Sequence, residues 1–393
     1  MIRLIFSSLL IFLLFSTSSS AQDTLHQNTG EILLGQGGNM SIRGYAQIDY
    51  NQKIDSDIRY NGALDVHRFV LFVGYKFSDK TSFISELEVE HANEFFVEQA
   101  FLNHNISRGI NFRAGMLLIP MGIVNEYHEP TTFHGVERPN LDKYIVPTTW
   151  REIGAGFQGN IQNANLKYQA YVVNGFKSFD VEGLLRGSDG LRKGRQKGIK
   201  SILSHPNLSG KVSYYGIKSL NIGASAYLGK TSSTLYNNLA SDADSLTKNA
   251  DSSVVGVNMV GLDARYEIKG VQIRGQYIFA ILSNTKEYNA FTNADLGNQM
   301  QGYYVELAYE VMQHLKSDAK TKLYPFVRIE NYNTHYAVEG LTENKAYNRN
   351  EITTGLTYKI HEGVDLKADM QFLDNDAIAK ATKQLNIGVG VWF

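Results

Sequence analysis

The last ten residues of the chain, Gln384–Phe393, alternate between apolar and polar side chains. In an extended strand, one side would carry Leu385, Ile387, Val389, Val391 and Phe393. Such alternation is typical of membrane β-barrel strands, which face lipid on one side and a polar interior on the other. We therefore predict a closing barrel strand, with the terminal Phe393 as the signal for the barrel-assembly machinery. The alternative is a half-buried strand that ends a soluble domain.

The opposite end of the chain predicts export. A short positive start at Arg3 precedes the apolar run Leu4–Phe15, and small residues follow up to Ala21. This order is typical of a secretory signal peptide, and the apolar run is shorter than the roughly 20 residues of a spanning helix. We expect residues 1–21 to be the signal peptide, residues 22–40 a periplasmic extension and residues 41–393 the barrel domain.

Period-2 alternation between turn residues predicts about sixteen strands in the rest of the chain. Most span about 9 to 13 residues, which suits tilted strands that cross a bilayer, whereas strands of soluble proteins cluster near about 5 or 6. The alternation of Phe95–Ile106 is irregular, so its register stays open. The predicted strands are Ser41–Asn51, Asp65–Ser78, Thr81–His91, Phe95–Ile106, Gly109–Leu118, Arg151–Ile161, Asn165–Asn174, Gly210–Tyr215, Leu220–Leu228, Val254–Ile268, Val271–Leu282, Gln301–Val311, Lys322–Asn333, Glu351–Ile360, Val364–Leu373 and Gln384–Phe393.

The connections between these strands alternate in length. Short turns such as Lys269-Gly270 are followed by long polar segments such as Gly175–Ser209, although His91–Glu94 is short where a long loop is due. Long extracellular loops and short periplasmic turns are typical of outer-membrane barrels. The predicted fold is therefore all-β, a transmembrane antiparallel β-barrel in the bacterial outer membrane.

Composition narrows the possible functions. The chain has no cysteine, which excludes disulfides and thiolate metal sites, and we expect no metal and no cofactor. With 38 Lys and Arg against 39 Asp and Glu, the net charge is −1, so we expect no nucleic-acid partner. Sixteen strands enclose an aqueous lumen, in which charged wall residues of both signs should largely neutralise one another.

The segment Leu118–Trp150 contains four of the six prolines. Proline fixes φ and stiffens a segment that has no strand partner, so we expect this loop to fold into the lumen as a constriction. The alternative is a surface loop over the barrel mouth. The candidate constriction and anion-contact residues are Arg68, Arg113, His128, Arg138, Lys143 and Arg151.

A second candidate is the glycine-rich basic segment Arg186–Lys200. At a pore entrance it would raise the local concentration of anions and contact phosphate groups. The alternatives are a solvated charged loop, contact with lipopolysaccharide phosphates, and a loop that discourages association. Its cations are Arg186, Arg192, Lys193, Arg195, Lys197 and Lys200.

Several motifs together resemble the phosphate-selective porin O and P family, especially its Bacteroidota-type members. They are RGYAQIDY (Arg43–Tyr50), MLLIPMG (Met116–Gly122), WREIGAGFQG (Trp150–Gly159) and the terminal strand. The resemblance runs from about Ser41 to Phe393. It implies a sixteen-stranded barrel, usually a homotrimer, that passes small anions such as phosphate.

The predicted function is an outer-membrane porin for passive diffusion of small hydrophilic solutes. The mixed charge of Leu118–Trp150 leaves general diffusion with a mild ion preference open. A surface barrel that acts mainly as an adhesin or receptor through its loops is the other alternative.

We expect no enzymatic activity. The chain has no nucleophile elbow, and Ser85 and His91 lie too far apart on one strand to form a hydrogen bond. Glu88, Glu90 and His91 resemble metal ligands by type, but strand alternation puts His91 on the face opposite the two glutamates.

Overall fold

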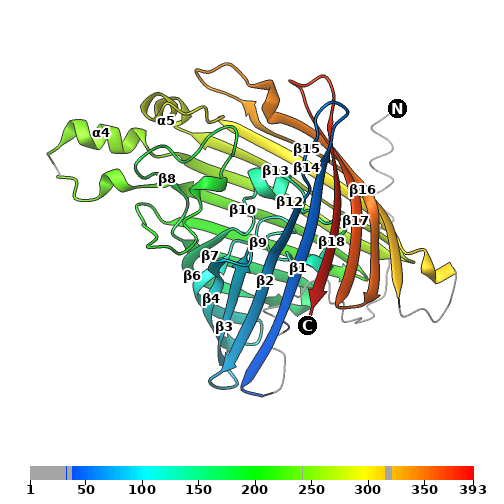
Figure 1. Ribbon diagram of the computed structural model, residues 1–393. Helices are drawn as coiled ribbons and strands as arrows, with labels where there is room; N and C mark the ends of the chain where they lie inside the picture. Colours follow the sequence, from blue (N-terminus) through cyan, green and yellow to red (C-terminus); the bar gives the residue numbers. More distant parts are fainter. Residues whose placement is uncertain (1–31, 33–37, 241, 315–320) are drawn as a thin grey trace, which may run out of the picture.

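Sixteen strands of the described residues form one closed antiparallel barrel. The computed structural model describes residues 32, 38–240, 242–314 and 321–393. Each strand pairs with its neighbour in the barrel order, and β18 returns to pair with β1 (Figure 1). The predicted signal peptide, residues 1–21, and most of the predicted extension, residues 22–40, lie outside the described residues.

Each predicted strand corresponds to one strand of the barrel, so the predicted fold class is confirmed. The barrel strands are β1 (Met40–Ile54), β2 (Ala63–Lys76), β3 (Thr81–Glu90), β4 (Glu94–Ser107), β5 (Ile110–Leu118), β6 (Arg151–Ile161), β7 (Leu166–Val173), β9 (Asn207–Ile217), β10 (Leu220–Lys230), β12 (Gly256–Ile268), β13 (Val271–Ser283), β14 (Gln299–Tyr309), β15 (Lys322–Ala337), β16 (Asn348–His361), β17 (Val364–Asn375) and β18 (Thr382–Trp392).

Apolar and polar side chains alternate between the outside and the inside of the barrel. In β18, Ile387 is 48% exposed on the outer face, whereas the neighbouring Asn386 is 0% exposed. Asn386 donates to Asp369 on β17 across the inner face. An apolar outside and a polar inside is the arrangement that lipid requires of a closed barrel.

The barrel closes where the end of the chain meets β1. Phe393 and Gly44 exchange two backbone hydrogen bonds of 2.9 Å. The Phe393 ring lies over Gly44, where an added Cβ would come within 2.7 Å of it, and its centroid is 6.4 Å from that of Phe69. The terminal residue thus completes the last pair of strands, and its role as an assembly signal stays a prediction.

Strand β4 explains why the register of Phe95–Ile106 was ambiguous. Glu86 pairs with Gln99 and Leu87 pairs with Val97, so Glu98 is an extra residue in β4. This β-bulge turns both Glu98 and Gln99 inward, where both are buried. The simple two-residue period therefore fails at this one place in the strand.

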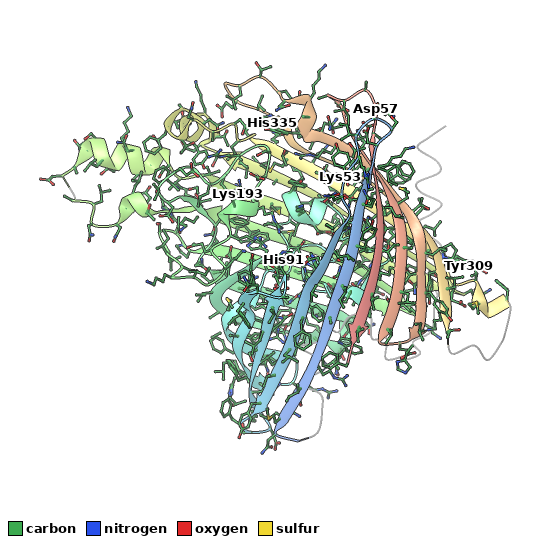
Figure 2. All side chains as sticks on the ribbon, viewed as in Figure 1. Lys53, Asp57, His91, Lys193, Tyr309 and His335 are labelled. Atoms are coloured by element: carbon green, nitrogen blue, oxygen red, sulfur yellow. The ribbon has the colours of Figure 1, made fainter. Side chains whose placement is uncertain are left out.

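The long loops gather at one end of the barrel, as Asp57 and His335 mark in Figure 2, while Tyr309 marks the opposite end. Two of these loops carry the helices α4 (Asp244–Ser252) and α5 (Thr285–Thr292), which lie beyond the strand ends in Figure 1. A two-stranded sheet, β8 (Lys177–Phe179) and β11 (Ser232–Ser233), joins two of the long loops. No helix in the described part of the chain is long and apolar enough to cross a membrane.

Candidate functional site

The loop between β5 and β6, residues 119–150 and hereafter the inner loop, lies inside the barrel. It contains the 3₁₀ turn η2 (Pro130–Thr132) and the short helix α3 (Leu141–Tyr144), and most of its residues are buried. At its start, Gly122 has a φ of +68° and approaches Gln276 so closely that an added Cβ would lie 2.6 Å from the side-chain oxygen. Only glycine fits this approach of the backbone to the wall.

Wall residues on opposite sides of the barrel hold the inner loop. Lys211 of β9 donates to the Gly122 carbonyl at 2.6 Å. On other strands, Asp369 accepts from the Val136 N–H at 2.7 Å and Glu330 accepts from the Leu141 N–H at 3.1 Å. A loop anchored to β9, β15 and β17 crosses the lumen, which confirms the predicted position and rules out a loop that only covers the mouth.

Many charged wall residues neutralise one another, as the sequence predicted. The Glu306 carboxylate forms ion pairs with both Arg274 and Arg328, and the Arg328 guanidinium lies 3.4 Å from it. Lys211 contacts Asp263 at 2.9 Å and Glu126 at 3.2 Å. Because removing one partner of a buried ion pair leaves an uncompensated charge, these pairs are structural, and the pair of Lys211 with Glu126 joins the wall to the inner loop.

Next to the inner loop is a cavity of about 200 Å³, hereafter the basic cavity. It is bounded by β2, β3 and β6, by the inner loop, and by the basic segment Arg186–Lys200, so that elements far apart in sequence meet there. Its acidic lining residues are Glu88, Glu90, Glu137 and Asp142. Its lysine and arginine lining residues are Arg68, Arg138, Lys143, Arg151, Arg192, Arg195 and Lys197.

Ion pairs neutralise only two of these cations among the described residues. Arg68 lies 3.4 Å from Glu88, and Arg151 lies 3.4 Å from Glu98. In the same part of the chain, the other cations are not within 4.0 Å of any carboxylate oxygen; they are Arg138, Lys143, Arg192, Arg195 and Lys197. Among the described residues, the basic cavity therefore holds more lysine and arginine side chains than close ion pairs neutralise.

Two guanidinium groups of the basic segment converge on one backbone oxygen. Arg192 and Arg195 each donate to the Thr148 carbonyl, at 3.0 and 2.9 Å. Burial, and then the nearby positive charges of Arg192 and Arg151, lower the pKa of Arg195. Positive groups that crowd together in this way favour an anion between them, and arginine suits oxyanions because it donates several parallel hydrogen bonds.

The cluster of cations extends from the basic cavity into a neighbouring cavity. A second cavity of about 630 Å³ adjoins the basic cavity. The two cavities share the lining residues Lys143, Arg192, Arg195 and Lys197. The outer cavity also includes Lys193, which pairs with Asp189 at 2.8 Å.

Asp142 of α3 adds a titratable group to the basic cavity. It is 1% exposed, and its Oδ1 accepts from the Gln276 side chain at 2.8 Å. Burial raises the pKa of Asp142 to about 7, even though the hydrogen bond from Gln276 and nearby arginines lower it. Asp142 therefore changes charge near neutral pH while the neighbouring arginines stay positive.

The structure separates the six predicted constriction residues. Arg68, Arg138, Lys143 and Arg151 line the basic cavity. Arg113 does not, because its guanidinium lies 4.7 Å from the centre of the Phe101 ring and donates to Asn103 at 3.0 Å.

His128 is not among the cavity-lining residues either. Its Nε2 lies 3.2 Å from carboxylate oxygens of both Glu86 and Glu98. Burial disfavours the charged ring, but the two carboxylates outweigh burial and raise the pKa of His128 to about 10. Without another cation in this place, the imidazole carries its extra proton at neutral pH, and it is not available to a solute in the basic cavity.

The basic segment also divides. Arg192, Arg195 and Lys197 line the basic cavity and are partly buried, so these three differ from the exposed residues of the segment. The exposed Arg186 pairs with Glu182 at 3.4 Å, and Lys200 is exposed outside both cavities. Strand alternation gives no orientation for a loop, so the sequence could not distinguish these residues.

Two further residues differ from the sequence analysis. His91 lines the basic cavity together with Glu88 and Glu90, so the expected opposite orientation is wrong. It begins a tight turn with a φ of +52°, where strand alternation has ended. Glu98, which contacts both His128 and Arg151, was missed; the adjacent polar pair Glu98-Gln99 in an apolar strand was the available signal of a bulge.

No protein-family model matches the chain. An uncharacterized protein of Aquifex aeolicus (strain VF5) is 33% identical over 349 residues, which cover 84% of this chain and 74% of the Aquifex protein. The chain belongs to the same family as this Aquifex protein. This relationship places the chain in a sequence family and gives no information about the solute.

Solved structures show the fold of this family member. OmpF of Salmonella typhi in complex with daunomycin matches with a TM-score of 0.58 at 13% identity, over 91% of this chain and 98% of that chain. An anion-selective porin from Comamonas acidovorans matches at 0.56 and 13% identity, over 90% and 99%. The outer membrane channel DcaP of Acinetobacter baumannii matches at 0.56 and 11% identity, over 90% and 97%. The chain has the fold of outer-membrane porins.

Proposed function

We propose that the protein is an outer-membrane porin through which small hydrophilic anions, such as phosphate, diffuse passively. The observation that carries this proposal is the basic cavity, where five cations without a carboxylate partner in the described residues meet beside the inner loop. The barrel fold and the predicted signal peptide support a location in the bacterial outer membrane.

The partners that we propose follow from the same features. The apolar outer face would contact outer-membrane lipid and lipopolysaccharide, and Phe393 would be read by the barrel-assembly machinery. The resemblance to the phosphate-selective porin O and P family supports phosphate as a solute and a homotrimer as the assembly. We propose passive transport and no catalysis, cofactor or nucleic-acid partner.

The direct test is the single-channel conductance of the purified mature protein in a planar bilayer. Under a KCl gradient we expect conductance with a reversal potential of the anion-selective sign, and partial block by millimolar phosphate. Conductance without ion preference or block would mean general diffusion. A silent barrel would contradict the channel and favour a surface role of the long loops.

The charge of Asp142 predicts a pH dependence of selectivity. Below pH 7 its carboxyl group is protonated and neutral, and as the pH rises through about 7 it gains a negative charge in the basic cavity. Anion preference should therefore be greater at about pH 5 than at about pH 9, with a change of roughly threefold in the anion-to-cation permeability ratio from this one charge. Reversal potentials measured at both pH values give this ratio.

The variant Asp142→Asn is a matched control, because the amide oxygen can still accept from Gln276. The variant should show a smaller change in selectivity between the two pH values than the wild-type protein. Glu88, Glu90 and Glu137 stay in place, so the difference between the two profiles isolates Asp142. Identical pH profiles for both proteins would show that Asp142 does not contribute to selectivity.

A further inference from the structure

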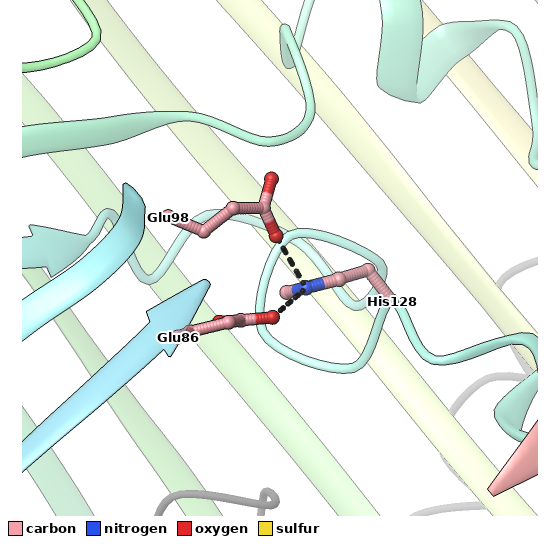
Figure 3. A group of neighbouring side chains, drawn as sticks. All are labelled: Glu86, Glu98 and His128. Atoms are coloured by element: carbon pink, nitrogen blue, oxygen red, sulfur yellow. Dashed lines mark hydrogen bonds and ion pairs between the residues drawn. The ribbon is translucent and has the colours of Figure 1, made fainter. Parts of the chain in front are cut away.

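Three buried side chains meet where the inner loop touches the barrel wall (Figure 3). His128 comes from the inner loop, Glu86 from β3 and Glu98 from the bulge of β4. The His128 Nε2 atom is 3.2 Å from Glu86 Oε1 and 3.2 Å from Glu98 Oε2. The three donor atoms lie within 4.8 Å of one another, and each residue is at most 1% exposed.

Surrounding groups orient all three side chains toward a common point. The other imidazole nitrogen, Nδ1, lies 3.3 Å from the Asn125 carbonyl, which directs Nε2 at the two glutamates. The second oxygen of Glu86 accepts from Gln99 at 2.6 Å, and the second oxygen of Glu98 accepts from Thr149 and Arg151. Metal-binding histidines and carboxylates are commonly held in this way by an outer layer of hydrogen bonds.

Hydrogen bonds alone leave this cluster incompletely satisfied. Glu98 Oε2 is buried, and no hydrogen bond of good geometry reaches it among the described residues, although the His128 Nε2 atom lies 3.2 Å away. Both separations of 3.2 Å exceed the roughly 2.7–2.9 Å of a charge-assisted N–H···O bond. Within the same described residues, Glu86 has no lysine or arginine within 4.0 Å of its carboxylate. A buried carboxylate oxygen without a well-aligned donor needs an explanation, and a bound cation supplies one.

We propose that Glu86, Glu98 and His128 bind one divalent transition-metal ion, for which zinc is the first candidate. One imidazole nitrogen and two carboxylate oxygens are ligands that zinc takes at about 2.0–2.2 Å, and such bonds at tetrahedral angles put the ligand atoms about 3.3 Å apart. The observed separations of 3.2 Å already match this value. Three protein ligands leave the fourth position to water.

The metal would connect the inner loop to the wall beside the basic cavity. His128 belongs to the loop, whereas both glutamates belong to adjacent strands, so the ion would restrain the loop against β3 and β4. Binding of the ion does not depend on conductance, and it goes beyond the sequence expectation that no metal is bound. The sequence concealed the site because its ligands come from three separate segments and one lies at a bulge.

The test is metal loading of the mature, folded barrel in detergent. Bound metal is first removed from the protein with EDTA. The protein is then incubated with zinc and desalted, and its zinc content is measured by elemental mass spectrometry. We expect one zinc ion per chain, and at least about 100-fold weaker binding in Glu98→Gln and His128→Asn, since loss of a ligand should exceed the effect of losing an outer-layer contact. His134→Asn and Glu152→Gln change other buried residues of the lumen and should keep the zinc.

Folding of every variant is checked by the heat-dependent mobility of the barrel in gel electrophoresis. If the ligand variants do not fold, cobalt(II) is added to the wild-type protein instead. Cobalt(II) bound by four ligands gives visible absorption bands, and zinc that displaces the cobalt should abolish them. A wild-type barrel that retains no zinc and gives no cobalt bands would overturn the proposal. Equal zinc content in His128→Asn and His134→Asn would also overturn it.

Discussion

Replacing both Arg192 and Arg195 with alanine is expected to reduce the anion preference of the channel strongly while leaving it open. The two guanidinium groups are aimed at the Thr148 carbonyl in the basic cavity, and neither lies within 4.0 Å of a carboxylate oxygen in the described chain. Each of the two charges should contribute about 1 kcal/mol to the preference, since a charge in water interacts with an ion at about 4 Å with roughly this energy. The anion-to-cation permeability ratio should therefore fall by more than about tenfold.

The matched control is Arg186→Ala with Lys200→Ala, which removes the same charge from the same segment. Both residues are exposed and lie outside the two cavities. Reversal potentials in a KCl gradient should shift in the first double variant and stay near the wild-type value in the control. An equal shift in both would mean that the overall charge of the segment, and not the basic cavity, sets selectivity. If neither double variant shifted the reversal potential, the basic segment would not contribute to ion selectivity.

The barrel could be predicted from the sequence because lipid and water impose a two-residue period on each strand. The alternation of Ile387 and Asn386 in the sequence is the alternation of outside and inside in the structure. The period failed where local geometry changed it, at the bulge residue Glu98 and at the turn residue His91. Both exceptions contact or line the candidate sites, as is common for β-bulges near functional positions.

The site was predictable only in outline. The prolines in residues 119–150 led to the prediction of a loop inside the lumen, and its cations Arg138 and Lys143 do line the cavity. The sequence could not show that Arg192 turns inward while Arg186, six residues earlier, stays exposed, because that difference depends on how the loop packs against Thr148. It also could not show that His128 is held between two glutamates that come from separate strands.

The inner loop has two parts that differ in their supports. At its base, the Asn125 side chain donates to the Ile119 and Trp150 carbonyls and accepts from the Trp150 N–H at 2.7 Å, so this part is closed on itself. The part beyond it, residues 127–146, contacts the distant wall through Asp369 and Glu330. The hydrogen bonds of Asn125 would remain if the second part were shortened, so the base of the loop keeps its own closure.

Replacing residues 127–146 with a short glycine-serine linker is expected to raise the single-channel conductance severalfold and to weaken the anion preference. The removed residues cross the lumen and include Arg138 and Lys143 of the basic cavity. The wall carboxylates that they cover would be hydrated, because sixteen strands enclose a lumen wide enough for water. The barrel should still close, since its backbone hydrogen bonds run between strands that the deletion leaves intact.

The comparison is a deletion of residues 242–250 at α4, which lies beyond the ends of the strands (Figure 1). That variant should keep the wild-type conductance and selectivity. Passage of larger uncharged sugars, measured by liposome swelling, should increase when the inner loop is shortened and not when α4 is deleted, because the inner loop crosses the lumen beside the basic cavity. If the shortened loop left both conductance and sugar passage unchanged, the constriction would have to lie elsewhere in the barrel, and the basic cavity would lose its proposed place on the solute path.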